Sequence, residues 1–172
     1  MSSNVIKDLV KQAKHGDMAA FGKLYTTVAA DLYRFAVFQT GSPDRAEDAV
    51  SEAVLLAFQK IRNLEKDAAF KSWMFSILLN CCRKQLREKQ AQLLTVVPED
   101  TDIPAAAIDL SENAALKGAL RQLEDEEREL FLLSVLFGYN SKELAELTHS
   151  KPATVRSKLF RTKGKLQALL KE

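Results

Sequence analysis

Apolar residues recur at intervals of three and four along most of the chain, the spacing that places them on one face of an α-helix. In the first half this pattern predicts four helices, over about residues 5–13, 18–40, 43–61 and 72–90. Asp17, Ser42 and Ser72 are the expected N-caps of the last three. Pro43 suits a first helical position, because the N–H that proline lacks has no partner there.

Each of these helices has one apolar stripe that should be buried and one polar face that should meet solvent or a partner. The stripe of the helix over 18–40 consists of Phe21, Leu24, Tyr25, Val28, Leu32 and Phe35. That of the helix over 43–61 consists of Ala46, Val50, Ala53, Val54, Ala57 and Ile61. That of the helix over 72–90 consists of Phe75, Leu78, Leu79, Cys82 and Leu86. The first half is therefore expected to form a helical body around these stripes.

The last third of the chain has the pattern of a helix-turn-helix. Residues 125–137 predict a helix with three acids near its start, and Gly138 stands just beyond its last turn. Ser141 is expected as the N-cap of one short helix, and Pro152 begins a second. A break at residues 149–151 separates these two helices.

The helix that begins at Pro152 has two chemically different faces. In a helix with about 100° per residue, one side is apolar and should face the rest of the protein. This side carries Val155, Leu159, Leu166 and Leu169. The other face and its flank carry Thr154, Arg156, Ser157, Lys158, Phe160 and Arg161. An outward aromatic ring between two arginines suits the major groove of DNA, where arginine pairs with guanine and an aromatic contacts a thymine methyl. The alternative is a solvated basic face with Phe160 in a contact to protein.

The outward face of the helix over 43–61 mixes acidic, polar and apolar residues, namely Asp48, Glu52, Leu55, Leu56 and Gln59. Acids around exposed leucines predict a docking surface for a basic helical partner. Spacing alone equally allows these leucines to meet another part of this chain.

A basic stripe headed by a tryptophan runs along the helix over 72–90. It consists of Trp73, Ser76, Asn80, Arg83, Lys84 and Arg87. This set fits a junction between duplex and single-stranded nucleic acid, because an indole stacks on bases while arginine and lysine follow phosphates. The alternative is that Trp73 packs under a neighbouring helix.

Charge divides the 172 residues into three parts. Residues 1–92 carry a net charge of +4, residues 93–112 one of −5, and residues 113–172 one of +3. The middle part also breaks the helical pattern, and a helix restarts near Ser111. We therefore expect an all-α protein with two basic helical domains joined by an acidic linker, a layout that suits polyanion binding at two places.

Several classes of protein do not fit the sequence. Cys81 and Cys82 are adjacent, so they suit neither a disulfide framework nor a metal site, and they are expected to act as small apolar residues. The chain shows no signal peptide and no apolar run long enough for a membrane span, which predicts a cytoplasmic protein without membrane insertion. His15 and His149 lie in different bodies, and no nucleophile–base pair, phosphate loop or metal cluster is visible. No enzyme activity, cofactor or metal is expected.

Five segments, in this order and spacing, resemble the extracytoplasmic-function group of bacterial RNA polymerase sigma factors over almost the whole chain. They are AAFGKLY (Ala19–Tyr25), RAEDAVSEAVLLAF (Arg45–Phe58), FKSWMFSILLN (Phe70–Asn80), LEDEERELFLL (Leu123–Leu133) and KELAELTHSKPATVRSKLFR (Lys142–Arg161). The resemblance implies a promoter-melting helical domain, a linker and a helix-turn-helix domain, and a protein that directs core RNA polymerase to specific promoters.

The resemblance also implies a role for each surface. The outward face of the last helix would read the upstream (−35) element. Trp73, Asn80 and the loop 63–71 would handle the −10 element, with one base of the open strand captured by the loop. The acidic face around Asp48 and Glu52 would grip the clamp helices of the polymerase β′ subunit. The β flap and an anti-sigma factor are further implied partners, and the acidic linker would follow the path of nascent RNA.

Four residues of this sequence differ from the family's usual pattern, namely Ser51, Lys84, His149 and Gly164. Ser51 and Lys84 replace a common glutamine and aspartate, His149 replaces a turn glycine, and Gly164 interrupts the last helix. Two other classes of protein remain open. One is a stand-alone helix-turn-helix regulator, and the other is a helical adaptor that binds no nucleic acid.

Overall fold

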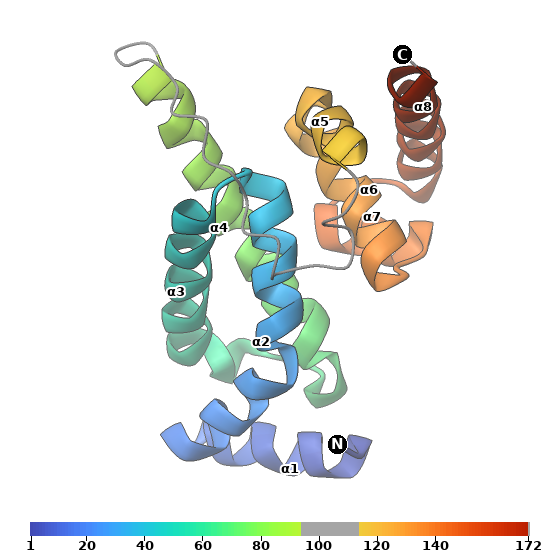
Figure 1. Cartoon of the computed structure of the whole chain (residues 1–172). Helices are drawn as coiled ribbons and strands as arrows, with labels where there is room; N and C mark the ends of the chain where they lie inside the picture. The colour runs from blue at the N-terminus through green and yellow to red at the C-terminus, as the bar shows by residue number, and fades with distance from the viewer. Residues whose placement is uncertain (94–113, 172) are drawn as a thin grey trace.

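The computed structural model describes residues 1–93 and 114–171, and every regular element within them is a helix (Figure 1). The α-helices are α1 (Ser3–Lys14), α2 (Met18–Thr40), α3 (Pro43–Lys60), α4 (Phe70–Leu93), α5 (Ala114–Gln122), α6 (Asp125–Phe137), α7 (Ser141–Thr148) and α8 (Pro152–Lys171). Two short 3₁₀ helices, η1 (Ile61–Asn63) and η2 (Asp67–Ala69), connect α3 to α4. The predicted all-α class is confirmed.

Most of the predicted helix ends are confirmed. The Asp17 carboxylate accepts a hydrogen bond from the Ala20 N–H at 3.1 Å, and the Ser42 hydroxyl accepts one from the Arg45 N–H at 3.3 Å. Gly138 follows α6 with a φ of 69°, in the left-handed region that glycine adopts without steric cost.

Two predicted caps are wrong. Asn140, not Ser141, caps α7: its side chain accepts from the Glu143 N–H, and the Glu143 carboxylate accepts from the Asn140 N–H in return. Ser72 does not cap α4, because that helix begins two residues earlier and the Ser72 hydroxyl donates to the Ala69 carbonyl. The linker predicted over 93–112 and the helix start at Ser111 lie outside the described residues, apart from the backbone of Leu93 at the end of α4.

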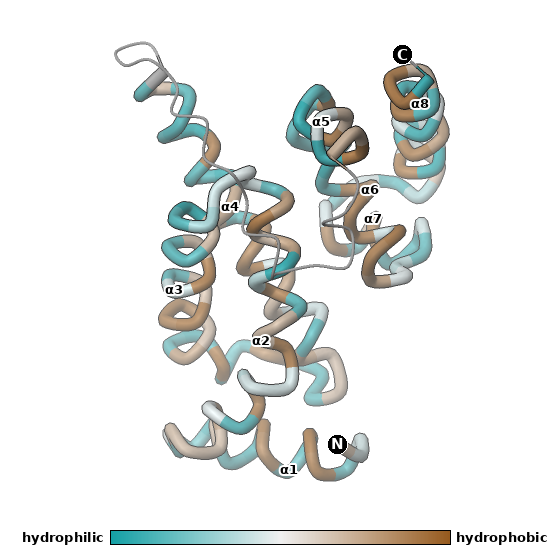
Figure 2. The backbone as a smooth tube through the Cα atoms, in the orientation of Figure 1, coloured by the Kyte–Doolittle hydropathy of each residue, from teal (hydrophilic) through white to brown (hydrophobic). Residues whose placement is uncertain are grey.

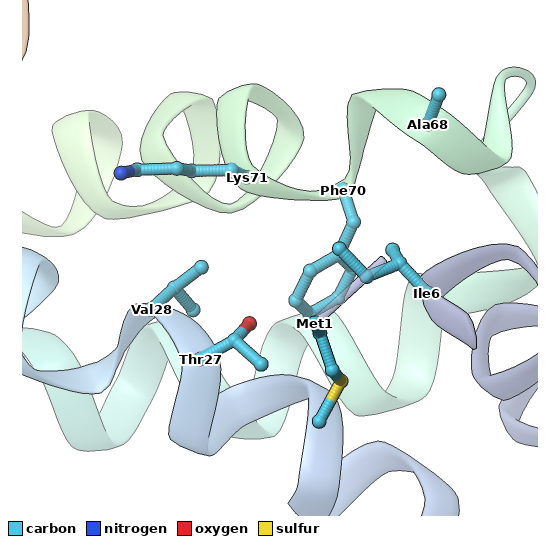
Figure 3. Close-up of a pocket in the computed structure, with 7 residues that line it drawn as sticks. All are labelled: Met1, Ile6, Thr27, Val28, Ala68, Phe70 and Lys71. Atoms are coloured by element: carbon cyan, nitrogen blue, oxygen red, sulfur yellow. The ribbon is translucent and has the colours of Figure 1, made fainter. Parts of the chain in front are cut away.

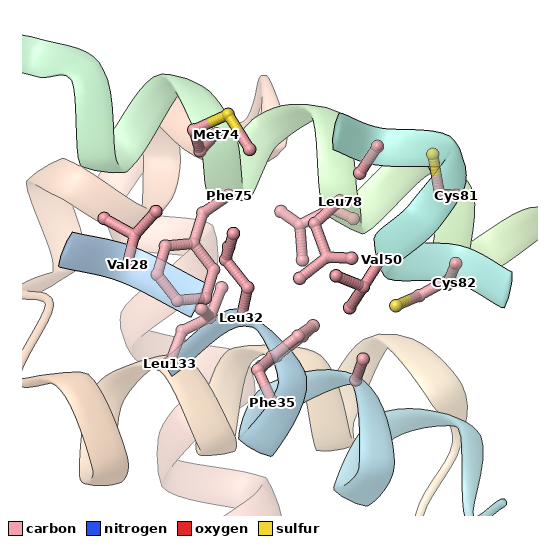
Figure 4. Close-up of a cluster of buried hydrophobic side chains, with 14 of the residues drawn as sticks. Val28, Leu32, Phe35, Val50, Met74, Phe75, Leu78, Cys81, Cys82 and Leu133 are labelled. Carbon is pink, nitrogen blue, oxygen red and sulfur yellow. The ribbon is translucent and has the colours of Figure 1, made fainter. Parts of the chain in front are cut away.

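Helices α2, α3 and α4 enclose the N-terminal core. Figure 4 shows the side chains that meet there, and the Phe35 and Phe75 rings pack edge to face with centroids 5.9 Å apart. In Figure 2 the apolar sides of these helices turn toward one another. The predicted stripes are buried, except that Tyr25 and Val54 are half-buried. Among the described residues no helix is long and apolar enough to cross a membrane.

Both cysteines are buried in this core, as the sequence predicts. Burial raises the pKa of the Cys81 thiol to about 11, with a smaller contribution from Glu52, and burial also raises the pKa of Cys82. Because the thiolate is the reactive form, we expect both cysteines to resist iodoacetamide at pH 7.5 in the native protein and to react within minutes in guanidinium chloride. Rapid labelling of the native chain would contradict the buried placement.

Helices α5 to α8 form a second group of packed helices. The apolar side of α8 is buried as predicted at Val155, Leu159 and Leu166, with Leu169 half-buried. Thr162 is also fully buried, which the sequence did not indicate, and its hydroxyl donates to the Lys158 carbonyl at 2.7 Å. This bond explains how a polar residue fits the apolar side of a helix.

The two groups of helices contact each other directly along α2 and α6. All six residues from 35 to 40 at the end of α2 are buried, on every side of the helix. One amphipathic stripe cannot account for this, because burial all round a helix requires partners on two sides. Helices α3 and α4 cover one side, and α6 covers the other.

Candidate nucleic-acid interface

The outward face of α8 is open to solvent. Thr154, Arg156, Ser157, Phe160 and Arg161 are all exposed, whereas Lys158 is half-buried. Phe160 is 81% exposed, a large value for an aromatic side chain. The buried side of the same helix fixes this orientation, since residues on the opposite side of an α-helix must then face outward.

A tight turn between α7 and α8 presents this face. His149 adopts the left-handed conformation, with a φ of 53°, and is the only described non-glycine residue with positive φ. The Ser150 N–H donates to the Ala145 carbonyl at 2.9 Å, and the Thr148 and Ser150 hydroxyls lie 2.7 Å apart. His149 thus adopts a backbone conformation that glycine takes more readily than other residues.

Two lysines of α8 are bound to acids of α6. Lys158 pairs with Glu126, and Lys165 pairs with Glu127. The hydrogen bond from Lys165 is the main cause that lowers the pKa of Glu127. These pairs join α8 to α6, and the acids lie more than thirty positions away in the sequence. Lys158 is therefore held within the domain in this structure, whereas the sequence grouped it with the DNA-binding residues.

The predicted stripe on α4 is only partly open. Asn80, Lys84 and Arg87 are exposed, while Ser76 is half-buried and donates its hydroxyl to the Trp73 carbonyl. Trp73 is also half-buried, with its ring 6.3 Å from that of Phe70. The indole therefore packs on its own domain with one part and meets solvent with the other.

Two cations of this stripe have carboxylate partners that the sequence did not predict. Arg83 donates to both carboxylate oxygens of Glu129 on α6, at 3.2 and 2.7 Å, and also to the side-chain oxygen of Asn80 at 3.2 Å. Lys84 donates to Glu52 on α3 at 2.9 Å. The Lys84 pair thus connects the stripe to the predicted docking surface.

Glu129 lies on the buried side of α6 and is only 2% exposed. Burial raises its pKa, and the ion pair with Arg83 opposes that shift. A signal for this contact was present in the sequence: Glu129 is followed by the apolar run from Leu130 to Leu133, and a carboxylate buried in such a place needs a cationic partner. The identity of the partner could not be read from spacing.

A small cavity lies beside the loop between α3 and α4. Its volume is about 180 Å³, and Ala68, Phe70 and Lys71 form the wall on the loop side. Met1 and residues from α1 and α2 complete the lining, as Figure 3 shows. Lys71 is held by Asp31 at 2.7 Å. The predicted base-capturing loop therefore borders a mostly apolar hollow.

The predicted docking face of α3 is accessible. Asp48, Leu55 and Gln59 are exposed, and Leu55 is 65% exposed. Glu52 and Leu56 are half-buried, and Leu56 packs partly against the core. The sequence left open whether Leu55 and Leu56 pack against this chain or remain free for a partner. In the structure Leu56 packs partly against the core, whereas Leu55 faces solvent.

Each of the two groups of helices matches a known protein family. The family described as Sigma-70 region 2 matches residues 24–92, and the family described as Sigma-70, region 4 matches residues 113–166. The chain is 26% identical over 155 residues to the ECF RNA polymerase sigma factor SigM of Mycobacterium tuberculosis, covering 90% of this chain and 79% of SigM. The chain belongs to the extracytoplasmic-function sigma factors.

Solved structures agree with the fold of this sigma factor. The sigma factor RpoE of Bartonella quintana, in complex with the anti-sigma factor NepR, has a TM-score of 0.75 at 28% identity, over 88% of this chain and 96% of that one. CnrH in complex with the cytosolic domain of CnrY has a TM-score of 0.76 at 24% identity, over 97% of both chains.

The four residues that differ from the family's usual pattern all have a clear place in the structure. Ser51 is exposed on α3, and Lys84 forms the ion pair with Glu52. Helix α8 continues through Gly164 to Lys171 without a break. Added to the left-handed His149, these observations place all four departures within an intact sigma-factor fold.

Proposed function

We propose that this sigma factor directs core RNA polymerase to promoters by binding the −35 element with α8 and opening the −10 element with α4 and the adjacent loop. Residues 1–92 would carry −10 recognition and polymerase docking, 93–112 would be the acidic linker, and 113–172 would carry −35 recognition. The observation that supports this best is the exposed face of α8, where Phe160 stands open between Arg156 and Arg161.

At the −35 element, α8 would lie in the major groove. Arg156 and Arg161 would hydrogen-bond base edges, Phe160 would contact a thymine methyl, and Thr154 and Ser157 would bond bases or phosphates. Lys158 can reach a phosphate only by exchanging its pair with Glu126. We therefore assign base reading to the arginines and a lesser share to this lysine.

At the −10 element, Asn80 and Arg87 offer exposed polar groups, and the half-exposed Trp73 would offer its indole for stacking on a base. One unpaired base would enter the hollow beside the loop. Each stacked base contributes on the order of 1–3 kcal/mol, against a mean cost of about 1.4 kcal/mol per DNA step unstacked. Binding energy alone would therefore drive local melting, with no covalent chemistry by this chain.

The docking face of α3 would bind the clamp helices of the polymerase β′ subunit. Asp48 and Glu52 supply negative charge beside the exposed Leu55, a combination suited to a basic amphipathic helix. The C-terminal domain would meet the β flap, and the acidic linker would lie in the positively charged path of nascent RNA.

An anti-sigma factor is a further proposed partner. RpoE and CnrH, which share this fold, were each solved with a second protein, NepR and CnrY respectively. We assign the cytoplasm as the compartment, because the polymerase and the promoter DNA are there.

Run-off transcription on a library of genomic fragments tests the proposal. We expect core polymerase alone to give no defined start sites, and core with this chain to start at a small set of promoters that share two spaced elements. A stand-alone regulator would instead bind duplex DNA without polymerase, and an adaptor would do neither. Either of those results would overturn the assignment.

A further inference from the structure

The connection between α3 and α4, which contains the loop 63–71, turns the same side inward at every third residue. Ile61, Leu64 and Phe70 are each no more than 3% exposed. Three residues per turn is the period of a 3₁₀ helix, and η1 and η2 both belong to this connection. Asp67 occupies the remaining inward position, where its side chain is 21% exposed. A carboxylate placed among apolar anchors needs a cationic or hydrogen-bonding partner.

Lys14, the last residue of α1, is the partner of this carboxylate. Its ammonium group donates to Asp67 at 2.8 Å and to the Leu64 carbonyl at 2.6 Å. Leu64 has an extended backbone directly after η1, so its carbonyl lies outside the regular hydrogen bonding of a helix. One side chain therefore holds the loop at two points that are three residues apart.

A third contact joins the same two segments in the opposite direction. The Arg62 side chain donates to the Lys14 carbonyl at 3.1 Å. A cation on the last carbonyls of a helix also interacts favourably with the helix dipole. These contacts join residues 48 to 53 positions apart, so they could not be read from local spacing.

Helix α1 also forms part of the hollow beside the loop. Ile6 of α1 lines one side, and Ala68 and Phe70 line the loop side (Figure 3). Ala68 directly follows Asp67, the residue that Lys14 holds. The position of the loop wall relative to α1 therefore depends on the contacts made by the Lys14 ammonium.

We propose that Lys14 is a positioning residue for −10 recognition: it fixes the loop against α1 and so sets the shape of the hollow. This role rests on the proposed function, in which the hollow receives one unpaired base. Helix α1 precedes the residues that match Sigma-70 region 2, so the family match gives Lys14 no part in recognition. Lys14 would act through Leu64 and Asp67, because a loop already held in its binding conformation loses less entropy when the base enters.

Amide hydrogen exchange of the free chain tests the contact without polymerase or DNA. Lys14→Met removes the ammonium but keeps an unbranched side chain. The Leu64 and Ala69 amides each donate to a carbonyl three residues earlier. We expect both to exchange at least about tenfold faster in the variant, since a hydrogen bond to a charged group is worth about that factor. Amides in the middle of α4 should keep their wild-type rates, which separates loosening of the loop from unfolding.

Transcription with core polymerase tests the consequence for promoter choice. On promoters carrying every single-base change in the −10 element, we expect Lys14→Met to reduce discrimination at one position by at least about fivefold. Preferences at the other −10 positions and in the −35 element should be unchanged. Lys14→Arg keeps a cation that can donate to both acceptors, and it should restore most of the preference. Lys11→Met replaces an exposed lysine of the same helix and should match the wild type in both experiments.

An abasic site separates positioning from general support of the domain. We would place it in a template already open over the −10 element, at the position where Lys14→Met loses its preference. Wild type and Lys14→Met should then be equally active, because the base that the loop would hold is missing. Asp67→Asn should also reduce the preference, and adding it to Lys14→Met should cause no further loss, since both changes remove the same contact.

The proposal is overturned by wild-type exchange rates in Lys14→Met, by an equal loss of activity on all promoters, by failure of Lys14→Arg to restore the preference, or by a difference that persists on the abasic template. Its failure is distinguishable from failure of the proposed function. A faster-exchanging loop with an unchanged base preference refutes positioning by Lys14 and leaves the sigma-factor mechanism intact. A wild type that gives core polymerase no start-site preference refutes the mechanism itself.

Discussion

Joint replacement of Asp48 and Glu52 by lysine is expected to abolish capture of core RNA polymerase. Both acids lie on the accessible face of α3 beside the exposed Leu55. Two reversed charges would face a basic partner helix, and like charges placed together at an interface cost several kcal/mol. At about 1.4 kcal/mol per factor of ten, the loss of affinity should be at least a hundredfold. Co-purification of tagged protein with core enzyme, without DNA, measures it.

Two controls make this result specific. Asp8 and Glu47 are also exposed acids of the N-terminal half, on α1 and α3, and their joint replacement by lysine changes the net charge equally. That variant should still capture polymerase. Lys84→Ala removes the partner of Glu52 while keeping both docking acids, so it too should bind normally. Unimpaired capture by the Asp48/Glu52 variant would refute α3 as the docking surface.

Arg161→Ala is expected to weaken use of a cognate −35 element by about 1–3 kcal/mol, or roughly 5- to 150-fold, and to relax the base preference at one position. Arg161 is exposed on the outward face of α8, and its side chain donates a long hydrogen bond of 3.4 Å to the Ser157 carbonyl. It can therefore turn to a base edge at little cost. Transcription from promoters carrying every single-base change in the −35 element measures both effects.

Lys163→Ala provides the comparison for this prediction. Lys163 is exposed on the flank of the same helix and carries the same charge. A phosphate contact carries no sequence information, so its loss should lower activity on all promoters in the same proportion. If Arg161→Ala behaved in that way as well, base reading by Arg161 would be excluded.

Local rules were sufficient for much of the fold and for the orientation of the sites. The period of apolar residues placed the buried sides of α2, α3, α4 and α8, and so placed Phe160 in solvent. Caps at Asp17 and Ser42 followed from backbone chemistry. The caps assigned to Ser72 and Ser141 were wrong for different reasons. Helix α4 begins two residues before Ser72. At α7, Asn140 forms a reciprocal pair with Glu143 three positions on, whereas Ser141 has Leu144 at that spacing.

The sequence by itself determined which residues lie on which side of each helix, because that depends on neighbours three or four positions away. Only the tertiary structure decided the partners of Arg83, Lys84 and Lys158, which lie 46, 32 and 32 positions from their acids. It also decided that the two basic halves meet, with α6 covering the end of α2. The like net charge of the two halves opposes this contact, but net charge acts weakly through salt and water, whereas buried rings and paired charges at contact distance act strongly.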